Sequence, residues 1–261
     1  MVSAAREAYW DTVRRSRYGW RGIVAIVLTL AAAQFACSDA NPNRPDEMGD
    51  PEGPNALTPA ERAAGWRLLF DGRTTAGWRG FKQSSIPGGW QVVDGALTRV
   101  SGAGDIITLD QFANFELTVE WQISPGGNSG IMYRVSEAAD ATYQTGPEMQ
   151  VLDNAGHPDG ANPLSSAGAC YGLYPPSSNA TRPVGSWNDV RIVVNGTHVE
   201  QWLNGAKVVE YELFSADWLA RLQVSPHRDS VRYGREPTGY IALQDHGDRV
   251  AYRSIKLRPL P

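Results

Sequence analysis

The sequence predicts an all-β fold, an antiparallel sandwich or jelly roll with one or two short helices. Most of the chain after residue 65 consists of short runs in which apolar and polar residues alternate, as in half-buried strands. Turn signals rich in Gly, Asn, Asp and Pro separate these runs. The sequence has neither a long alternation of strands with helical patterns nor a repeat of fixed period, which disfavours a βαβ fold, a propeller and a solenoid.

In chain order, the first expected element is a short helix. Thr58-Pro59-Ala60-Glu61 combines a threonine N-cap, a proline at the first helical position and a glutamate three residues after the cap, which together form a capping box. Alternating patterns then predict strands at 90–98, 115–123, 130–135, 149–152, 190–194, 199–203 and 240–244. Asn-Gly pairs at Asn195 and Asn204 predict tight hairpins, and a second short helix is expected near 216–222.

Residues 1–37 have the organisation of an export signal. Arginines at positions 14, 15, 17 and 21 precede an apolar run over 23–36, which is shorter than the roughly 20 residues needed to cross a bilayer. Cys37 follows this run in the position of a lipoprotein acceptor, so we expect lipidation there and a membrane anchor. Cleavage after the alanines at 31–33 is the alternative, and it would release a soluble periplasmic protein. Both routes export the folded part to the periplasm or the cell surface.

Residues 38–56 contain almost no apolar side chains and are rich in Asn, Asp, Pro, Gly and Glu. Such a segment cannot bury enough apolar surface to offset the entropy of ordering it, so we expect a flexible tether. The folded domain is therefore predicted over 57–261.

Charge and cysteine content limit the possible partners and cross-links. The formal net charge of -4 and the isoelectric point of about 5.6, without a dense basic run, argue against nucleic acid as a partner. Cys37 and Cys170 lie in such different contexts that we expect no disulfide between them. Cys170 has no base nearby in the sequence and is interpreted as a small packed residue.

Distinctive blocks follow one another along the predicted domain. In order, they are GWRLLFDG at 65–72, GNSGI at 127–131 leading to Arg134, EMQVLDN at 148–154, GSWN at 185–188, WLNG at 202–205 and IALQDHG at 241–247. Together these blocks resemble the 3-keto-disaccharide hydrolase domain family of bacterial secreted proteins. The resemblance extends over about 57–260 and therefore covers the whole predicted domain.

This resemblance implies a concanavalin-A-like jelly roll, in which the concave face of two curved sheets holds the ligand. It also implies a carbohydrate substrate, a glycoside whose C3 hydroxyl a separate sugar 3-dehydrogenase has oxidised to a ketone. The ketone acidifies the hydrogen on C2, so a base can remove it, the aglycone can leave C1, and water can then add back. Such a reaction needs a general base, a stabiliser for the enolate oxygen and a proton donor.

Glu148 and His246 are the candidate catalytic residues. Glu148 and Gln150 share one face of a predicted strand because side chains alternate across the pleat, and Gln244 and His246 share a face opposite Leu243. If both faces line the concave sheet, a carboxylate, two amides and an imidazole converge there. We then expect Glu148 to be the base and His246 to donate a proton or hold a cation. Patterning alone also allows Glu148 to be a solvated strand residue and His246 to be structural.

Other polar and aromatic residues are predicted to contact the substrate. These substrate-binding candidates are Arg134, Tyr143, His157, Asp153 and Tyr171, in addition to Gln150 and Gln244. Arg134 could hold sugar hydroxyls or the ketone oxygen, or it could form a buried ion pair. A divalent cation held by Glu148, Asp153 and His246 would polarise the ketone, although the sequence contains no fixed metal signature.

The sequence therefore favours a hydrolase that cleaves 3-keto-glycosides outside the cytoplasm. A non-catalytic carbohydrate-binding module or lectin is the alternative, because the same jelly roll serves both roles and fold does not fix function. A laminarinase-like glycoside hydrolase ranks last, because the Glu-x-Asp-x-x-Glu strand motif expected for it is missing.

Overall fold

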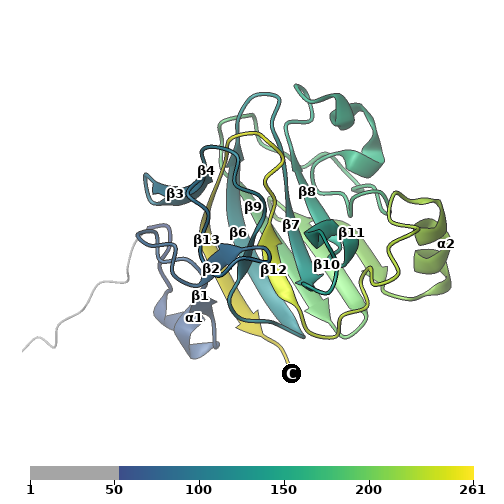
Figure 1. The fold of residues 1–261 in the computed structure, drawn as a ribbon, viewed down its shortest axis with the longest axis horizontal. Coiled ribbons are helices and arrows are strands. Elements are labelled where there is room, and N and C mark those ends of the chain that lie inside the picture. Colours follow the sequence, from purple (N-terminus) through teal and green to yellow (C-terminus); the bar gives the residue numbers. More distant parts are fainter. Residues whose placement is uncertain (1–52) are drawn as a thin grey trace, which may run out of the picture. The chain divides into compact units, whose positions relative to one another are not determined.

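The computed structural model describes residues 53–261, which form two antiparallel sheets packed face to face (Figure 1). The larger sheet has eight strands in the order β11-β10-β9-β6-β13-β4-β3, with β1 paired to β13. Its strands are β1 (Arg67–Leu68), β3 (Trp90–Val93), β4 (Ala96–Arg99), β6 (Phe115–Ile123), β9 (Asn188–Asn195), β10 (His198–Leu203), β11 (Ala206–Glu212) and β13 (Val250–Pro259). The predicted all-β jelly-roll class is confirmed.

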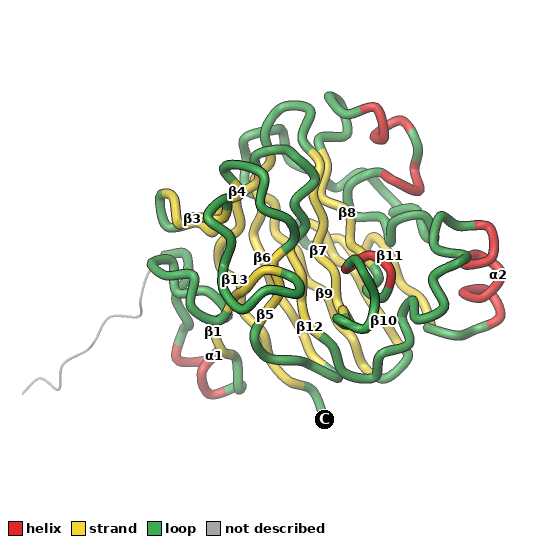
Figure 2. Tube along the Cα trace, in the orientation of Figure 1, coloured by secondary structure: helices red, strands yellow, loops and turns green. Residues whose placement is uncertain are grey.

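The smaller sheet has five strands in the order β2-β5-β12-β7-β8. These strands are β2 (Trp78–Gly80), β5 (Ile106–Thr108), β7 (Asn128–Val135), β8 (Glu148–Leu152) and β12 (Tyr240–Leu243). Helices are short and peripheral, as Figure 2 shows in red. They are α1 (Pro59–Ala63), η1 (Thr142–Gln144), η2 (Pro158–Ala161), η3 (Pro163–Ser165) and α2 (Ala216–Val224). Within residues 53–261, none of these helices has the length and apolar character of a membrane span.

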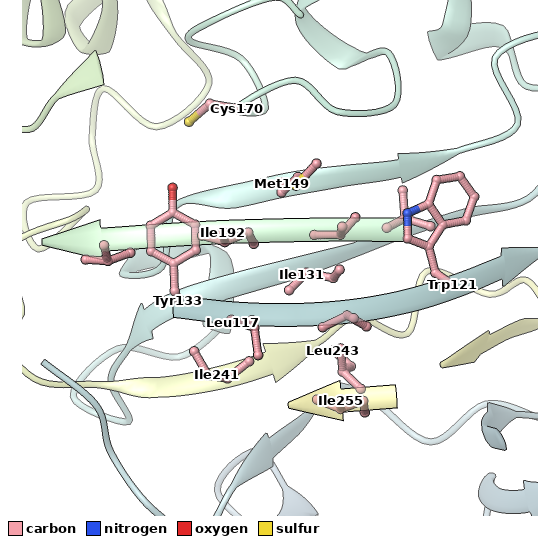
Figure 3. Close-up of a cluster of buried hydrophobic side chains, with 14 of the residues drawn as sticks. Leu117, Trp121, Ile131, Tyr133, Met149, Cys170, Ile192, Ile241, Leu243 and Ile255 are labelled. Atoms are coloured by element: carbon pink, nitrogen blue, oxygen red, sulfur yellow. The ribbon is translucent and has the colours of Figure 1, made fainter. Parts of the chain in front are cut away.

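Alternation along the strands places the core between the sheets. Leu117 and Ile192 project from the larger sheet, while Ile131, Met149 and Leu243 project from the smaller one, and none of the five is exposed to solvent (Figure 3). Burial of such side chains contributes about 25 cal/mol per Å² of apolar surface removed from water. Residues at the intervening positions of the smaller sheet, such as those beside Met149, consequently point away from this core.

The outer face of the larger sheet carries a ladder of ion pairs that crosses five strands. Glu116 on β6 accepts hydrogen bonds from both Arg191 on β9 and Arg258 on β13. Glu200 on β10 continues the ladder, lying 3.7 Å from Arg191 and 3.4 Å from Lys207 on β11. Cross-strand pairs of opposite charge stabilise a sheet, and here each charge has a neighbouring partner. This face is therefore occupied by mutually paired groups.

The N-terminal edge of the described chain is fixed to the sheets. The Thr58 side chain accepts a hydrogen bond from the Glu61 main chain, and the Glu61 carboxylate accepts one from the Thr58 main chain, so the predicted capping box is present. Asn55 also ties the chain down, because its side chain bonds to Gly95 and Ser254 at 2.8 Å each. Contact with the sheets thus begins inside the segment 38–56 that the sequence predicts as a tether. The predicted export signal at 1–37, including Cys37, lies outside the described residues.

Candidate functional site

A cavity of about 260 Å³ opens on the face of the smaller sheet that points away from the core. Polar and aromatic groups surround it: Asn128, Tyr143, Glu148, Gln150, Tyr171, Pro226, His227, Gln244 and His246. Six of the residues predicted from the sequence, Glu148, His246, Gln150, Gln244, Tyr143 and Tyr171, are therefore brought together here. Glu148 and His246 line the same cavity, although His246 lies in the loop after β12 and not on the strand predicted at 240–244.

Glu148 reaches this cavity because it begins β8, where Met149 and Val151 turn inward to the core. Its carboxylate lies over Gly130 of β7, the strand that pairs with β8. A Cβ atom at position 130 would lie 2.0 Å from Oε1 of Glu148, so only glycine leaves room for the carboxylate in this position. Because Gly130 has no side chain, the Glu148 carboxylate can occupy the space above it.

The environment of Glu148 favours its protonated form. The residue is 3% exposed, and burial raises the pKa of its carboxyl to about 8, with a further contribution from the negative charge of Asp105. Among the described residues, no hydrogen bond to the carboxylate offsets these effects. A carboxyl whose pKa lies near neutrality can accept or release a proton under physiological conditions, which is typical of catalytic acids and bases.

Two glutamines and an asparagine form the polar surface beside Glu148. Gln150 donates a hydrogen bond to the side chain of Asn128 at 3.3 Å, and both residues are buried. The main-chain N–H of Gln244 donates to the Gly130 carbonyl at 3.0 Å, which brings β12 against β7 at the cavity. The side-chain oxygen of Gln244 is buried and has no partner among the described residues. These amides can bind the hydroxyls of a sugar, which both donate and accept hydrogen bonds.

His246 lies at the exposed rim of the cavity, in the loop that follows β12. Asp245 holds this loop by an ion pair with Arg99 at 2.7 Å and by accepting hydrogen bonds from the main chain of Ala103 and Gly104. The ring of His157 lies 6.4 Å from that of His246 in an edge-to-face arrangement. His157 does not line the cavity, and its Nδ1 accepts a hydrogen bond from Asp159 at the start of η2.

His227 also lines the cavity, although it was not among the residues predicted from the sequence. His227 is 4% exposed, and its ring stacks on Tyr233 with centroids 4.2 Å apart. Burial lowers the pKa of His227 to about 4, so its imidazole is neutral at physiological pH. Tyr171 lines the cavity as well, and its main-chain N–H donates to the Glu148 carbonyl at 3.0 Å. No local sequence pattern marks His227, since the loop after α2 and the segment after η3 meet only in the folded chain.

Arg134 and Asp153 were predicted to bind substrate, but the structure places both outside this cavity. Arg134 has a φ of 56°, and its guanidinium donates to the Gly196 carbonyl instead. The left-handed backbone turns the side chain away from the face that alternation would assign to it. Asp153 accepts main-chain hydrogen bonds from Gly126 at 2.7 Å and Ala155 at 3.1 Å, and the first of these lowers the pKa of its carboxyl. Asp153 therefore fixes a turn.

The predicted metal ligands Glu148, Asp153 and His246 do not come together, because Asp153 lies in that turn. Among the described residues, the group whose potential ligand atoms lie within 4.8 Å of one another is His198, Glu200 and Glu210. This group lies on the outer face of β10 and β11, where Lys207 also contacts Glu200 and Glu210. It is part of the charged ladder on the larger sheet, away from the cavity.

Cys170 is buried and forms no disulfide within residues 53–261. Burial raises the pKa of its thiol to about 12, so the reactive thiolate is not formed at neutral pH. Cys170 is therefore a packing residue, as its sequence context predicts.

The sequence matches a family model over most of the folded region. The model describes a 3-keto-alpha-glucoside-1,2-lyase-like domain and matches residues 65–258. The chain is also 33% identical over 230 residues to the 3-keto-disaccharide hydrolase of Bacteroides thetaiotaomicron, an alignment that covers 76% of this chain and 79% of that protein.

Two solved structures from Parabacteroides distasonis, both of candidate glycosyl hydrolases, share the fold. One has a TM-score of 0.75 and 33% sequence identity, and the match covers 80% of this chain and 100% of that chain. The other has a TM-score of 0.56 and 25% identity, covering 70% of this chain and 99% of that chain. The two-sheet architecture is therefore shared with proteins whose structures have been solved.

The raised pKa of Glu148 predicts that this residue costs stability at high pH. The folded state keeps the Glu148 proton up to about pH 8, whereas the unfolded state releases it near pH 4.5. The contribution of this carboxyl to the free energy of unfolding is therefore fully present below pH 4.5 and is lost as pH rises through about 8. The free energy of unfolding of Glu148→Gln, relative to that of the wild type, should therefore increase by about 1.4 kcal/mol per pH unit between these two pH values. Urea unfolding at several pH values measures this difference. A constant difference between pH 5 and pH 9 would contradict the burial of an ionisable carboxyl here.

Proposed function

We propose that this chain, which belongs to the 3-keto-alpha-glucoside-1,2-lyase-like domain family, cleaves 3-keto-glycosides such as 3-keto-disaccharides. The observation that carries the proposal is the carboxylate of Glu148, which is buried without a hydrogen bond from any described residue in a cavity lined by amides, imidazoles and tyrosines. The substrate requires a ketone at C3, so a separate sugar-oxidising enzyme must act before this one. Family membership and the activity named for the Bacteroides relative support this substrate class.

The reaction proceeds by elimination followed by hydration. Glu148 takes the C2 proton, and the electron pair of that C–H bond moves into conjugation with the C3 ketone to give an enolate. Collapse of the enolate forms the C1=C2 double bond and breaks the bond between C1 and the glycosidic oxygen, which takes a proton as it leaves. Water then adds, with oxygen bonding to C1 and a proton to C2, so the net reaction is hydrolysis.

Glu148 is suited to the first step because its ionised form is a strong base. Burial and Asp105 make that ionised form less stable, which increases its tendency to take a proton from C2. Gln150 and Gln244 would bind the sugar hydroxyls or the enolate oxygen, since both amides line the cavity beside the carboxylate. His246, at the rim, is placed to protonate the leaving group, which would extend toward solvent past Tyr143.

Turnover separates this proposal from the lectin alternative, and substrate choice separates it from an ordinary glycosidase. Purified protein should release 3-keto-glucose from a 3-keto-disaccharide and leave the unoxidised parent disaccharide intact. A parallel incubation with chelator tests whether a divalent cation participates. Binding without turnover would support the carbohydrate-binding module, and cleavage of the parent sugar would support a conventional glycosidase.

Glu148→Gln should lower kcat/KM for a 3-keto-disaccharide by roughly 10²–10⁴-fold while leaving sugar binding intact, because glutamine keeps the size of the side chain but cannot take the C2 proton. Steady-state kinetics and calorimetric titration with the substrate measure the two effects. Glu210→Gln is a matched control, since Glu210 lies in the ladder of ion pairs on the larger sheet, away from the cavity. Wild-type turnover by Glu148→Gln would refute the assignment of the base.

Gly130→Ala tests the position of the carboxylate without removing it. The three atoms nearest to the added methyl group all belong to the flexible side chain of Glu148, so the protein should fold and displace the carboxylate. A displacement of about 1 Å at a catalytic group can cost roughly 10²-fold in rate. Gly88→Ala is the control, because a Cβ atom there meets nothing within 4 Å. Equal kcat/KM values for the two variants would show that the position of Glu148 does not matter.

We further propose that the protein works outside the cytoplasm as a lipoprotein anchored through Cys37. The order of basic, apolar and polar segments at 1–56 supports this location. Cys37→Ala should move the protein from the membrane fraction to the soluble fraction of its host cell. If the variant stays in the membrane fraction, an uncleaved apolar helix is the better explanation.

A further inference from the structure

Asp105, just before β5, lies outside the cavity lining but contacts both segments that form its rim. One of its carboxylate oxygens accepts a hydrogen bond from the main-chain N–H of Asp245 at 2.9 Å. The other accepts a hydrogen bond from the hydroxyl of Thr142. Thr142 precedes Tyr143, and Asp245 precedes His246, so each bond fixes the immediate neighbour of a residue that lines the cavity.

We infer that Asp105 is a positioning residue for this site, which holds the Tyr143 and His246 segments in place and brings a second carboxylate near that of Glu148. The inference rests on the proposed function, because it assigns Asp105 a role in the reaction that Glu148 begins. Asp105 does not contact substrate in this assignment. It acts through the residues that do.

Among the described residues, Asp105 is the charged side chain that acts on the Glu148 carboxyl, because most other ionisable groups around Glu148 are uncharged at neutral pH. Burial raises the pKa values of Cys170, Tyr171, Tyr233 and Tyr252, and it lowers that of His227 to about 4. Asp245 and His246 lie near Asp105, Arg99 pairs with Asp245, and Asp248 accepts a hydrogen bond from the main-chain N–H of Asn128 at the cavity. Asp245 is paired with Arg99 at 2.7 Å, so its negative charge is compensated locally.

Asp105 is itself under opposing influences. Burial raises the pKa of its carboxyl above the ordinary value, and the hydrogen bonds from Thr142 and Asp245 and the nearby His246 offset part of this rise by favouring the ionised form. The same two bonds that fix the rim therefore also help to keep the charge. This coupling explains how one side chain serves both the geometry and the electrostatics of the site.

Two substitutions separate these effects. In Asp105→Asn, the amide oxygen can still accept from Asp245 and the amide N–H can donate to Thr142, so the rim stays in place while the charge is lost. In Asp105→Ala, the charge and both bonds are lost. Asp140→Asn is the matched control, because this carboxylate lies two residues before Thr142 but is exposed and paired with Lys82.

We expect the acidic limb of kcat/KM against pH to move down by about one pH unit in Asp105→Asn, since a like charge near a carboxyl raises its pKa. The rate at high pH should fall as well, because the base becomes weaker. Asp105→Ala should show the same movement of the limb, together with a higher KM and a lower melting temperature. Asp140→Asn should match the wild type in all of these measurements.

The titration of Glu148 can also be followed without substrate. Proteins labelled with carboxyl-13C glutamate are titrated by NMR, and the Glu148 resonance is the one missing from Glu148→Gln. A lower midpoint in Asp105→Asn than in the wild type supports the inference, and coincident midpoints overturn it. If the wild type fails to cleave every 3-keto-glycoside tested, the proposed function is wrong, but this titration still decides whether Asp105 controls Glu148.

Discussion

The site depends on one constraint, the burial of the Glu148 carboxylate over Gly130 without a hydrogen bond from any residue of the described part of the chain. Burial of an ionised carboxylate is unfavourable in free energy, so Glu148 keeps its proton up to about pH 8. The side-chain-free position at Gly130 gives the carboxylate room, and the neighbouring amides of Gln150 and Gln244 face the same cavity. The same features that make Glu148 unfavourable for stability make it reactive toward a weakly acidic C–H bond.

The jelly roll makes this arrangement possible by separating core from site within single strands. On β8, Met149 and Val151 pack between the sheets while Glu148 and Gln150 face the cavity, so the polar residues are carried by a strand anchored in the core. Loops form the rim, and carboxylates hold those loops through hydrogen bonds and an ion pair. Asp245 binds one loop to Arg99, and Asp105 joins that loop to η1. A cavity whose base is a sheet and whose rim is held by hydrogen bonds and an ion pair is well suited to bind a hydroxyl-rich ligand.

The parts of the fold that follow regular alternation could be predicted from the sequence. The strand at 115–123 was predicted with its observed bounds, and the shared face of Glu148 and Gln150 followed from the same period. The run predicted at 90–98 is divided by a turn at Asp94 and Gly95, both of which have positive φ. The sequence pattern did not predict β13, because the backbone of this strand is irregular. Its pairing with β6 shifts between Arg253 and Lys256 around Ser254, whose φ is 50°.

The site could be predicted only where its residues lie on regular strands. Arg134 was assigned to the wrong surroundings because a φ of 56° reverses the direction that alternation implies. Asp105 and His227 carry no local signal, since their importance comes from segments far apart in the chain. Long-range contacts of this kind depend on the folded arrangement of loops, which sequence periodicity does not describe.

The central claim is that Glu148 removes the proton from C2 of a 3-keto-glycoside. The most direct test compares the initial rates of cleavage of a 3-keto-disaccharide carrying hydrogen or deuterium at C2, with kcat/KM measured for each. Our account predicts slower cleavage of the deuterated substrate, because its C–D bond must break before the leaving group departs. Equal rates, together with a product that retains deuterium at C2, would contradict it and would indicate direct hydrolysis at C1.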